Sequence, residues 1–397
     1  MAGSFPAPGV WLRLTALFAA VATGLAVVSG ALALGTAHRL LAALALPPLA
    51  ALVVAAWTAH RRLLPSALAA LVAFGAAALL TERALHVTVA AVAFALTCVT
   101  AAAAYRGAPV PRSSWRDYVT LTKPRIMSLL LLTAFCGMCV GAKGVPSVEL
   151  AAVTLAGLAL ACGGASALNH VLDRDIDRRM RRTGGRPVAA ERVSPARALE
   201  FGLCLSAFSF VVLASFVNLL AAALALVGNL FYVLVYTSWL KRRTPQNIVI
   251  GGAAGAVPPL VGWAAVTGNL TLPALLLFAI VFLWTPPHFW ALAILLKRDY
   301  EQARVPMLPV VRGERETSRQ ILLYSLVLVA VTAAPVAWGM LGLAYLGAAL
   351  VLGSALVGLA AWLRRDPTPR RAALLFHFSL LYLALVFVAM AVNPLLG

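Results

Sequence analysis

Long apolar stretches alternate with short polar ones along the whole chain of 397 residues. The apolar stretches run to about 18–25 residues, the length that a helix needs to cross about 30 Å of bilayer hydrocarbon. We therefore predict an all-α polytopic membrane protein with thirteen spans. Four spans are expected at residues 11–34, 38–58, 64–82 and 86–104, and nine at 126–143, 148–168, 197–215, 217–237, 247–267, 271–292, 320–339, 341–362 and 373–393.

A polar stretch separates these spans into two groups. It carries Pro109, Pro111 and several arginines, a composition typical of a linker. We predict a four-span membrane module at residues 1–104, a cytoplasmic linker at 105–116 and a nine-span domain at 117–397.

The basic residues give this arrangement an orientation, because cytoplasmic loops of membrane proteins are enriched in Lys and Arg. With the N-terminus in the cytoplasm, only Arg39, Arg83 and Lys143 of the 32 basic residues fall on the outer side. The net charge of +19 thus follows the loops and forms no continuous basic surface for nucleic acid. The N-terminus lacks a cleavable signal or transit-peptide pattern, so we expect a bacterial inner membrane protein.

The five cysteines all lie in apolar stretches. Cys136 and Cys139 have the spacing of a redox or zinc pair, but no second pair lies nearby. We expect them to pack as small hydrophobic side chains.

The strongest candidate for chemistry is an acidic motif at the end of the sixth span. Asn169, Asp173 and Asp177 follow at i, i+4 and i+8, so a helix presents their oxygens on one face, while Asp175 points the other way. One amide and two carboxylates suit Mg²⁺, which also takes water and substrate phosphate as ligands. The arginines around the motif could pair with a diphosphate, or could only set the membrane topology.

Two later cytoplasmic loops carry matching groups. Lys241 and Arg242 follow Tyr236 at the end of the eighth span. In the tenth span two prolines precede His288, and they predict an interrupted helix that faces a cavity. His288 is either a functional side chain or a hydrogen-bonded core histidine.

Together these segments resemble the UbiA superfamily of intramembrane prenyltransferases over about residues 117–397. The Thr-Pro-Pro-His-Phe-Trp and Val-Pro-Met-Leu-Pro segments point to the haem-modifying branch of that superfamily. The resemblance rests on Lys123-Pro-Arg125, Asn169-x3-Asp173-x3-Asp177 with Arg-Thr-Gly-Gly-Arg186-Pro187, Tyr236-Thr-x2-Leu-Lys241-Arg242, Trp284-Thr-Pro-Pro-His288-Phe-Trp, Asp299-Tyr300, Val305-Pro-Met-Leu-Pro309 and Phe376-His-Phe-Ser-Leu-Leu-Tyr382.

The resemblance implies nine helices around a cavity near the cytoplasmic face, in which farnesyl diphosphate binds with Mg²⁺. It implies transfer of the farnesyl group to a vinyl group of haem b, which gives haem O. Asn169, Asp173 and Asp177 would hold Mg²⁺ and diphosphate, and Lys241 would neutralise the leaving group. Further substrate contacts would come from Arg125, Arg178, Arg186, Tyr236, Arg242, His288 and Asp299, with Arg125 and His288 as the candidates for haem.

One part of the family pattern is weak in this chain. Many members carry a second aspartate-rich motif after the sixth helix of the domain. This chain has only Asp299 and Glu301 there, beside Lys297 and Arg298, so a full second magnesium site is in doubt.

Two other functions compete with this interpretation. The same acidic motif could serve prenylation of a quinone precursor or another aromatic acceptor. A membrane transporter is the non-enzyme alternative. The chain shows no inverted repeat, and its acidic motif lies at a membrane end instead of the midplane where transporter sites occur.

The four-span module carries His38 and His86 at the start of its second and fourth spans, and His60 at the opposite membrane face. Two histidines at equal depth on neighbouring helices are suited to bis-imidazole ligation of a bound haem. The segments around them also resemble half of the haem A synthase family, whose members act on haem O and would be partners in the pathway. A membrane scaffold with interfacial histidines is the alternative.

If the module binds haem, the purified full-length protein will show the spectrum of a low-spin bis-histidine haem. We expect His38→Ala or His86→Ala to remove that spectrum, while His60→Ala, at the other membrane face, keeps it. Absorption and electron paramagnetic resonance spectra of the four proteins make the comparison. Identical spectra would contradict the assignment of these ligands.

Overall fold

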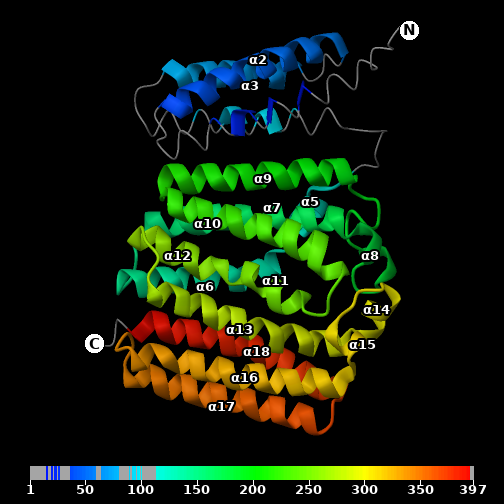
Figure 1. The fold of residues 1–397 in the computed structure, drawn as a ribbon, viewed down its shortest axis with the longest axis vertical. Helices are drawn as coiled ribbons and strands as arrows, with labels where there is room; N and C mark the ends of the chain where they lie inside the picture. The colour runs from blue at the N-terminus through cyan, green and yellow to red at the C-terminus, as the bar shows by residue number, and fades with distance from the viewer. Residues whose placement is uncertain are drawn as a thin grey trace.

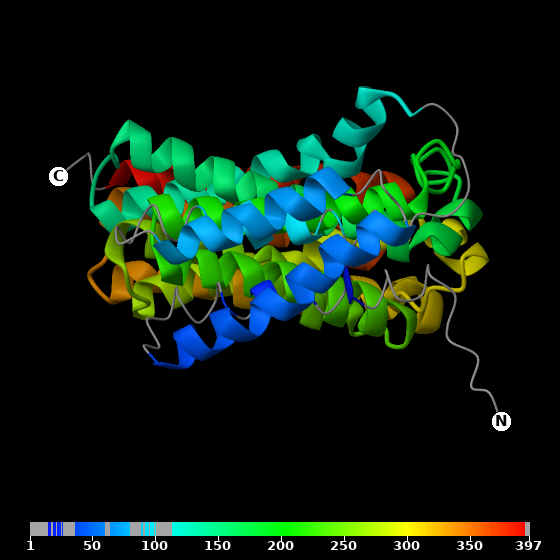
Figure 2. The ribbon, with the colours of Figure 1, turned by 90° about the horizontal axis from the view of Figure 1, so that it is seen from above.

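The computed structural model describes residues 36–59, 64–79 and 113–393, with scattered helical residues between 15 and 26 and between 89 and 100. Every regular element in these ranges is a helix, which confirms the all-α prediction. The long helices lie side by side along one common direction, horizontal in Figure 1. Seen from above, α2 (Thr36–Ala59) and α3 (Leu64–Leu79) cross the helices below them obliquely (Figure 2).

The main bundle begins after a short helix, α5 (Trp115–Thr122). Three further short helices lie in loops: α8 (Arg174–Arg179), α14 (Lys297–Gln302) and α15 (Leu308–Val311). The long segments are α6 (Pro124–Ala142), α7 (Val148–Leu172), α9 (Pro195–Phe216), α10 (Leu219–Leu230) continued by the π-helical η2 (Phe231–Trp239) and the 3₁₀ turn η3 (Leu240–Arg242), α11 (Asn247–Gly255) with α12 (Val257–Thr267), α13 (Leu272–Leu295), α16 (Gly313–Ala337), α17 (Leu343–Arg365) and α18 (Pro369–Val392).

Among the described residues, nine segments are long and apolar enough to cross a membrane. They coincide with the nine spans predicted for residues 117–397, so the protein is polytopic. The helix α16 begins at Gly313, before the predicted residue 320, because its polar first turns extend the helix beyond the apolar span. Since residues 1–35 and 80–112 are mostly outside the description, the total of thirteen spans and the domain division stay predictions.

The helix α13 runs unbroken through Pro286 and Pro287, so the predicted interruption of this helix is wrong. Each proline removes a hydrogen-bond donor, but its fixed φ is compatible with a helix. The helix packs against α16 and α18, and such neighbours allow a membrane helix to keep its path through proline.

The close contact between α6 and α12 depends on glycine. A Cβ atom on Gly262 would lie 2.0 Å from the carbonyl oxygen of Ala134, and one on Gly137 would lie 2.7 Å from that of Pro259. Membrane helices associate through such close van der Waals packing between small residues. Nearby on α6, Cys136 and Cys139 are buried as free thiols in the apolar core, as predicted.

Replacing Gly262 by alanine forces two helix backbones apart, and overpacking of this kind costs about 1–3 kcal/mol. We expect Gly262→Ala to lower the melting temperature in detergent by several degrees. Gly358→Ala on α17 is the matched control, because a Cβ atom there meets nothing within 4 Å. Equal melting temperatures for the two variants would contradict the proposed packing.

Candidate functional site

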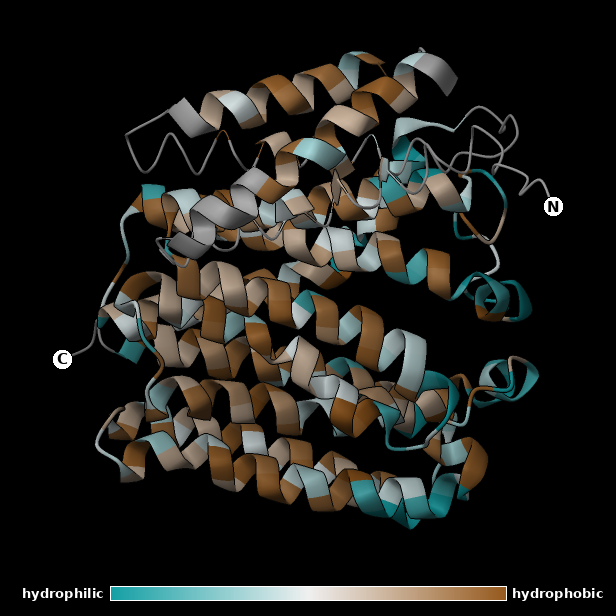
Figure 3. Cartoon of the chain, turned by 45° about the horizontal axis from the view of Figure 1, so that its top comes forward, coloured by the Kyte–Doolittle hydropathy of each residue, from teal (hydrophilic) through white to brown (hydrophobic). Residues whose placement is uncertain are grey.

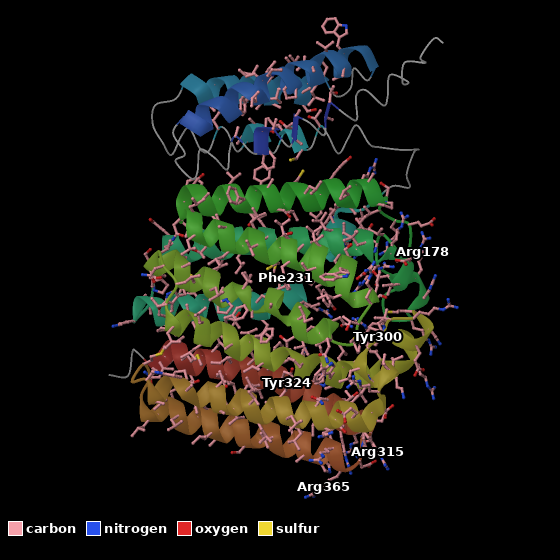
Figure 4. The ribbon with its side chains drawn as sticks, viewed as in Figure 1. Arg178, Phe231, Tyr300, Arg315, Tyr324 and Arg365 are labelled. Atoms are coloured by element: carbon pink, nitrogen blue, oxygen red, sulfur yellow. The ribbon has the colours of Figure 1, made fainter. Side chains whose placement is uncertain are left out.

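The loops that carry most candidate residues lie together at one end of the bundle. The helices α8 and α14 both lie at this end (Figure 1), which is rich in hydrophilic residues (Figure 3). Arg178 and Tyr300 mark the same end in Figure 4. The acidic motif and the loops after α8 and α13 therefore share one membrane face.

The acidic motif spans the junction of α7 and α8. The amide N–H of Asp173 donates to the carbonyl oxygen of Asn169 at 2.9 Å, and that of Asp177 donates to the carbonyl of Asp173 at 2.8 Å. Helical register thus continues through the junction and places the three side chains on one side. All three are buried, and Asp173 is 0 % exposed.

The Asn169 amide connects two elements to this motif. Its oxygen accepts a hydrogen bond from Lys123 Nζ at 2.8 Å, and because a lysine can only donate, the amide must present its oxygen there. Its nitrogen donates to Asp173 Oδ2 at 2.7 Å and to Thr237 Oγ1 at 3.2 Å. The amide is therefore fixed in orientation.

Asp173 forms a buried ion pair with Lys241. Lys241 Nζ lies 2.5 Å from Asp173 Oδ2, with side-chain exposures of 14 % and 0 %. Thr237 comes from the π-helical η2 and Lys241 from the 3₁₀ turn η3, which follow α10, and π-helical turns often mark functional sites. The other oxygen, Asp173 Oδ1, is buried without a hydrogen-bond partner among the described residues. An unpaired buried carboxylate oxygen is costly, and a cation ligand would relieve that cost.

The two other aspartates of the motif have different partners. Arg186 Nη1 lies 2.8 Å from both carboxylate oxygens of Asp177, in a partly buried pair. Asp175 is half exposed and pairs with Arg242 at 2.7 Å and 2.8 Å. These hydrogen bonds lower the pKa of Asp175 to about 2. Arg242 thus neutralises an outer carboxylate instead of joining the buried cluster.

Lys123 also belongs to this cluster, although the sequence pattern assigns it no functional role. It joins α5 to α6 in a left-handed conformation with φ of 51°. Its pKa is lowered to about 7, mainly because the ammonium group is buried and in part because the cations Arg186 and Lys241 lie nearby. A signal existed in the sequence, since Lys123 directly precedes the proline that opens a membrane span.

The residues of this cluster suit one magnesium ion bound with an anionic substrate. Asp173 offers an unpaired buried oxygen, and Asn169 and Asp177 follow in the same register. Lys123, Lys241 and Arg186 supply positive charge for a diphosphate. The described residues contain no group of three carboxylate, imidazole or thiol side chains, so water and substrate would have to complete the coordination.

His288 lies elsewhere, in an aromatic stack. Its ring lies between those of Trp284 and Phe376, at centroid distances of 4.3 Å and 4.6 Å. Its Nδ1 atom hydrogen-bonds to Ser379 Oγ at 2.8 Å, and the residue is buried. The stack covers both faces of the imidazole, so only its edge can meet a ligand.

The remaining candidates lie around the cluster. Arg178 turns outward to the Ala189 carbonyl and Glu191. Arg125 is exposed, and Tyr236 packs closely on Gly251 of α11. Asp299 accepts a 3.4 Å hydrogen bond from the backbone of Arg182, which ties α14 to the loop after α8. His86 and the side chain of His38 lie outside the described residues.

Sequence comparison places this architecture among known proteins. A profile of the UbiA prenyltransferase family matches residues 130–392. A protein named protoheme IX farnesyltransferase from Symbiobacterium thermophilum is 57 % identical over 281 residues, which cover 70 % of this chain and 94 % of that protein. A protein of the same name from Roseiflexus sp. is 54 % identical over 278 residues, or 70 % of this chain, but the match spans only 52 % of its length.

Solved structures show the same fold. A digeranylgeranylglyceryl phosphate synthase superposes with a TM-score of 0.60 at 18 % identity, over 71 % of this chain and 99 % of that chain. A UbiA homologue from Archaeoglobus fulgidus bound to GPP and Mg²⁺ superposes with a TM-score of 0.50 at 17 % identity, over 69 % of this chain and 99 % of that chain.

The buried cluster predicts a difference between two neighbouring aspartates. The Asp173 carboxylate pairs with Lys241 and also supplies the unpaired oxygen. Because Asp173→Asn removes its negative charge, we expect Mg²⁺-dependent pyrophosphate binding to weaken by about 10- to 100-fold. Asp175→Asn removes an equal charge at an exposed pair and should leave binding unchanged. Calorimetric titration of the full-length protein measures both, and equal affinities would contradict the proposed metal site.

Proposed function

This chain belongs to the UbiA prenyltransferase family, and on that premise we propose that it transfers the farnesyl group of farnesyl diphosphate to a vinyl group of protohaem IX, giving haem O. The buried cluster of Asp173, Asp177, Lys123, Lys241 and Arg186 carries the proposal, because it suits a metal-bound diphosphate. Relatives that are 57 % and 54 % identical and named for the haem reaction favour haem over a quinone precursor as acceptor.

The acidic face supplies the metal site. Asn169, Asp173 and Asp177 would hold Mg²⁺, which when bound would neutralise charge on the departing diphosphate. The structural neighbour bound to GPP and Mg²⁺ supports this assignment.

The cations act on the diphosphate itself. Lys241 and Arg186, which pair with Asp173 and Asp177, would lie beside the phosphate oxygens of a bound diphosphate. When the bond between farnesyl C1 and oxygen breaks, its electron pair stays with the diphosphate. Fixed positive groups, Lys123 included, stabilise that developing charge most strongly in a site from which water is excluded.

The apolar bundle protects the other product of ionisation, an allylic cation. Water would quench this cation, so the farnesyl chain has to lie in a dry environment. The vinyl group of haem attacks C1 and forms a carbon–carbon bond. Water then adds to the resulting cation and loses a proton, which leaves a hydroxyethylfarnesyl side chain. We assign haem contacts to the edge of His288 and to Arg125, whose guanidinium would bind a propionate.

The same charge pattern supports a location. We place the N-terminus and the active-site end in the cytoplasm of a bacterial cell, at the inner membrane, because the basic loops gather there. Haem O leaving this end would supply an enzyme of the haem A synthase type, and the His38 and His86 module is a candidate to hold a second haem near the outer membrane face.

A kinetic comparison tests the role of the cations. Lys241→Met removes a fixed positive charge, so we expect kcat for farnesyl transfer to haem b to fall on the order of 10²–10³-fold. Arg243→Met, which changes an exposed cation two positions away, should keep normal turnover. Product analysis by liquid chromatography and mass spectrometry gives the rates.

Two further arms of this assay test the acceptor. With 4-hydroxybenzoate in place of haem b, we expect no prenylated product. His288→Ala should raise KM for haem b while leaving KM for farnesyl diphosphate unchanged. Efficient 4-hydroxybenzoate prenylation would replace the haem assignment, and unchanged haem kinetics would remove His288 from the haem site.

A further inference from the structure

We propose that Arg192 is a positioning residue that clamps the loop after α8 onto α5 and thereby holds Arg186 at the diphosphate site. The role of Arg186 rests on the proposed function, but the clamp itself is a feature of this chain's own contacts. It is built from Gly185 and Arg192, which lie seven positions apart in the loop, and from Asp117, which lies 75 positions from Arg192.

Arg192 bridges two segments through two of its nitrogens. Its Nε atom donates to Asp117 Oδ1 of α5 at 2.8 Å. Its Nη2 atom donates to the carbonyl oxygen of Gly185 at 3.0 Å. Gly185 directly precedes Arg186, so the bridge fixes the backbone from which the Arg186 side chain reaches Asp177.

The loop needs such a clamp because its backbone is permissive at this point. Gly184 and Gly185 precede Arg186, and glycine loses the most conformational freedom when it is held in one conformation. The other bonds of Arg186 are short-range: its N–H donates to Thr183 and its carbonyl accepts from Ala190. Through Arg192 the carbonyl group next to Arg186 is tied to α5.

The helix α5 is a firm support for the clamp. Asp117 belongs to a capping box, in which its second oxygen accepts the Ser114 N–H at 3.1 Å. Leu121 is fully buried, and its carbonyl accepts a 2.6 Å hydrogen bond from Ser166 of α7. The hydrogen bond from Arg192 also lowers the pKa of Asp117, which keeps the carboxylate charged.

The two ends of α5 thus reach the same site by different routes. Its C-terminal end places Lys123 on Asn169, and Asp117 near its start holds the loop of Arg186 through Arg192. Because the Arg192 side chain is 47 % exposed, its ion pair adds little to the free energy of unfolding. Its role is to position the loop that carries Arg186.

Binding of inorganic pyrophosphate with Mg²⁺ to the full-length protein tests the clamp without any turnover. We expect Arg192→Gln to weaken this binding about tenfold and Asp117→Asn to weaken it similarly, with melting temperatures close to wild type. The double variant should be no weaker than either single one, since both changes break one bridge. In turnover assays KM for farnesyl diphosphate should rise more than kcat falls.

Glu191→Gln is the matched control, because it removes the exposed partner of Arg178 in the same loop. It should bind pyrophosphate normally. Normal binding by Arg192→Gln, or additive losses in the double variant, would overturn the clamp. The proposed function fails separately, if the wild-type protein binds pyrophosphate but makes no haem O.

Discussion

The buried ion pair between Asp173 and Lys241 is the contact on which the site depends. Two unpaired charges at this depth would each cost several kcal/mol, so the end of α7 and the 3₁₀ turn η3 have to meet where the pair forms. The pair leaves one carboxylate oxygen of Asp173 unpaired, and Asn169 and Asp177 continue the same face. The site therefore combines an oxygen that a metal ion could bind with cations that could bind a diphosphate.

The surrounding structure adds an apolar interior and further positive charges to this ion pair. The apolar helices, packed through contacts such as Gly137 and Gly262, provide a water-poor interior beside a polar end. The short helix α5 and the loop after α8 then add Lys123 and Arg186 from outside the spans. Ionisation of an allylic diphosphate needs both conditions, because charge must be stabilised at one end of the substrate while water is kept from the other.

Much of this arrangement was predictable because it is local in the sequence. Apolar length predicts the nine described spans, and i, i+4 spacing separates Asp173 and Asp177 from the exposed Asp175. Partners from distant segments were not predictable. Nothing in the spacing distinguishes Arg186, which enters the cluster, from Arg178, which turns outward.

The dependence on contacts between distant segments also explains the other differences between the sequence prediction and the structure. Lys123 and Arg192 acquire their roles from contacts across 46 and 75 positions. The unbroken α13 shows that neighbouring helices can override proline.

The most direct test of the account is the haem extracted from membranes of a bacterium that lacks its own haem O synthase and expresses this chain. Mass spectrometry should find haem O with the wild-type chain and only haem b with Asp173→Asn. Haem b alone with both, at equal amounts of membrane-inserted protein, would contradict the account.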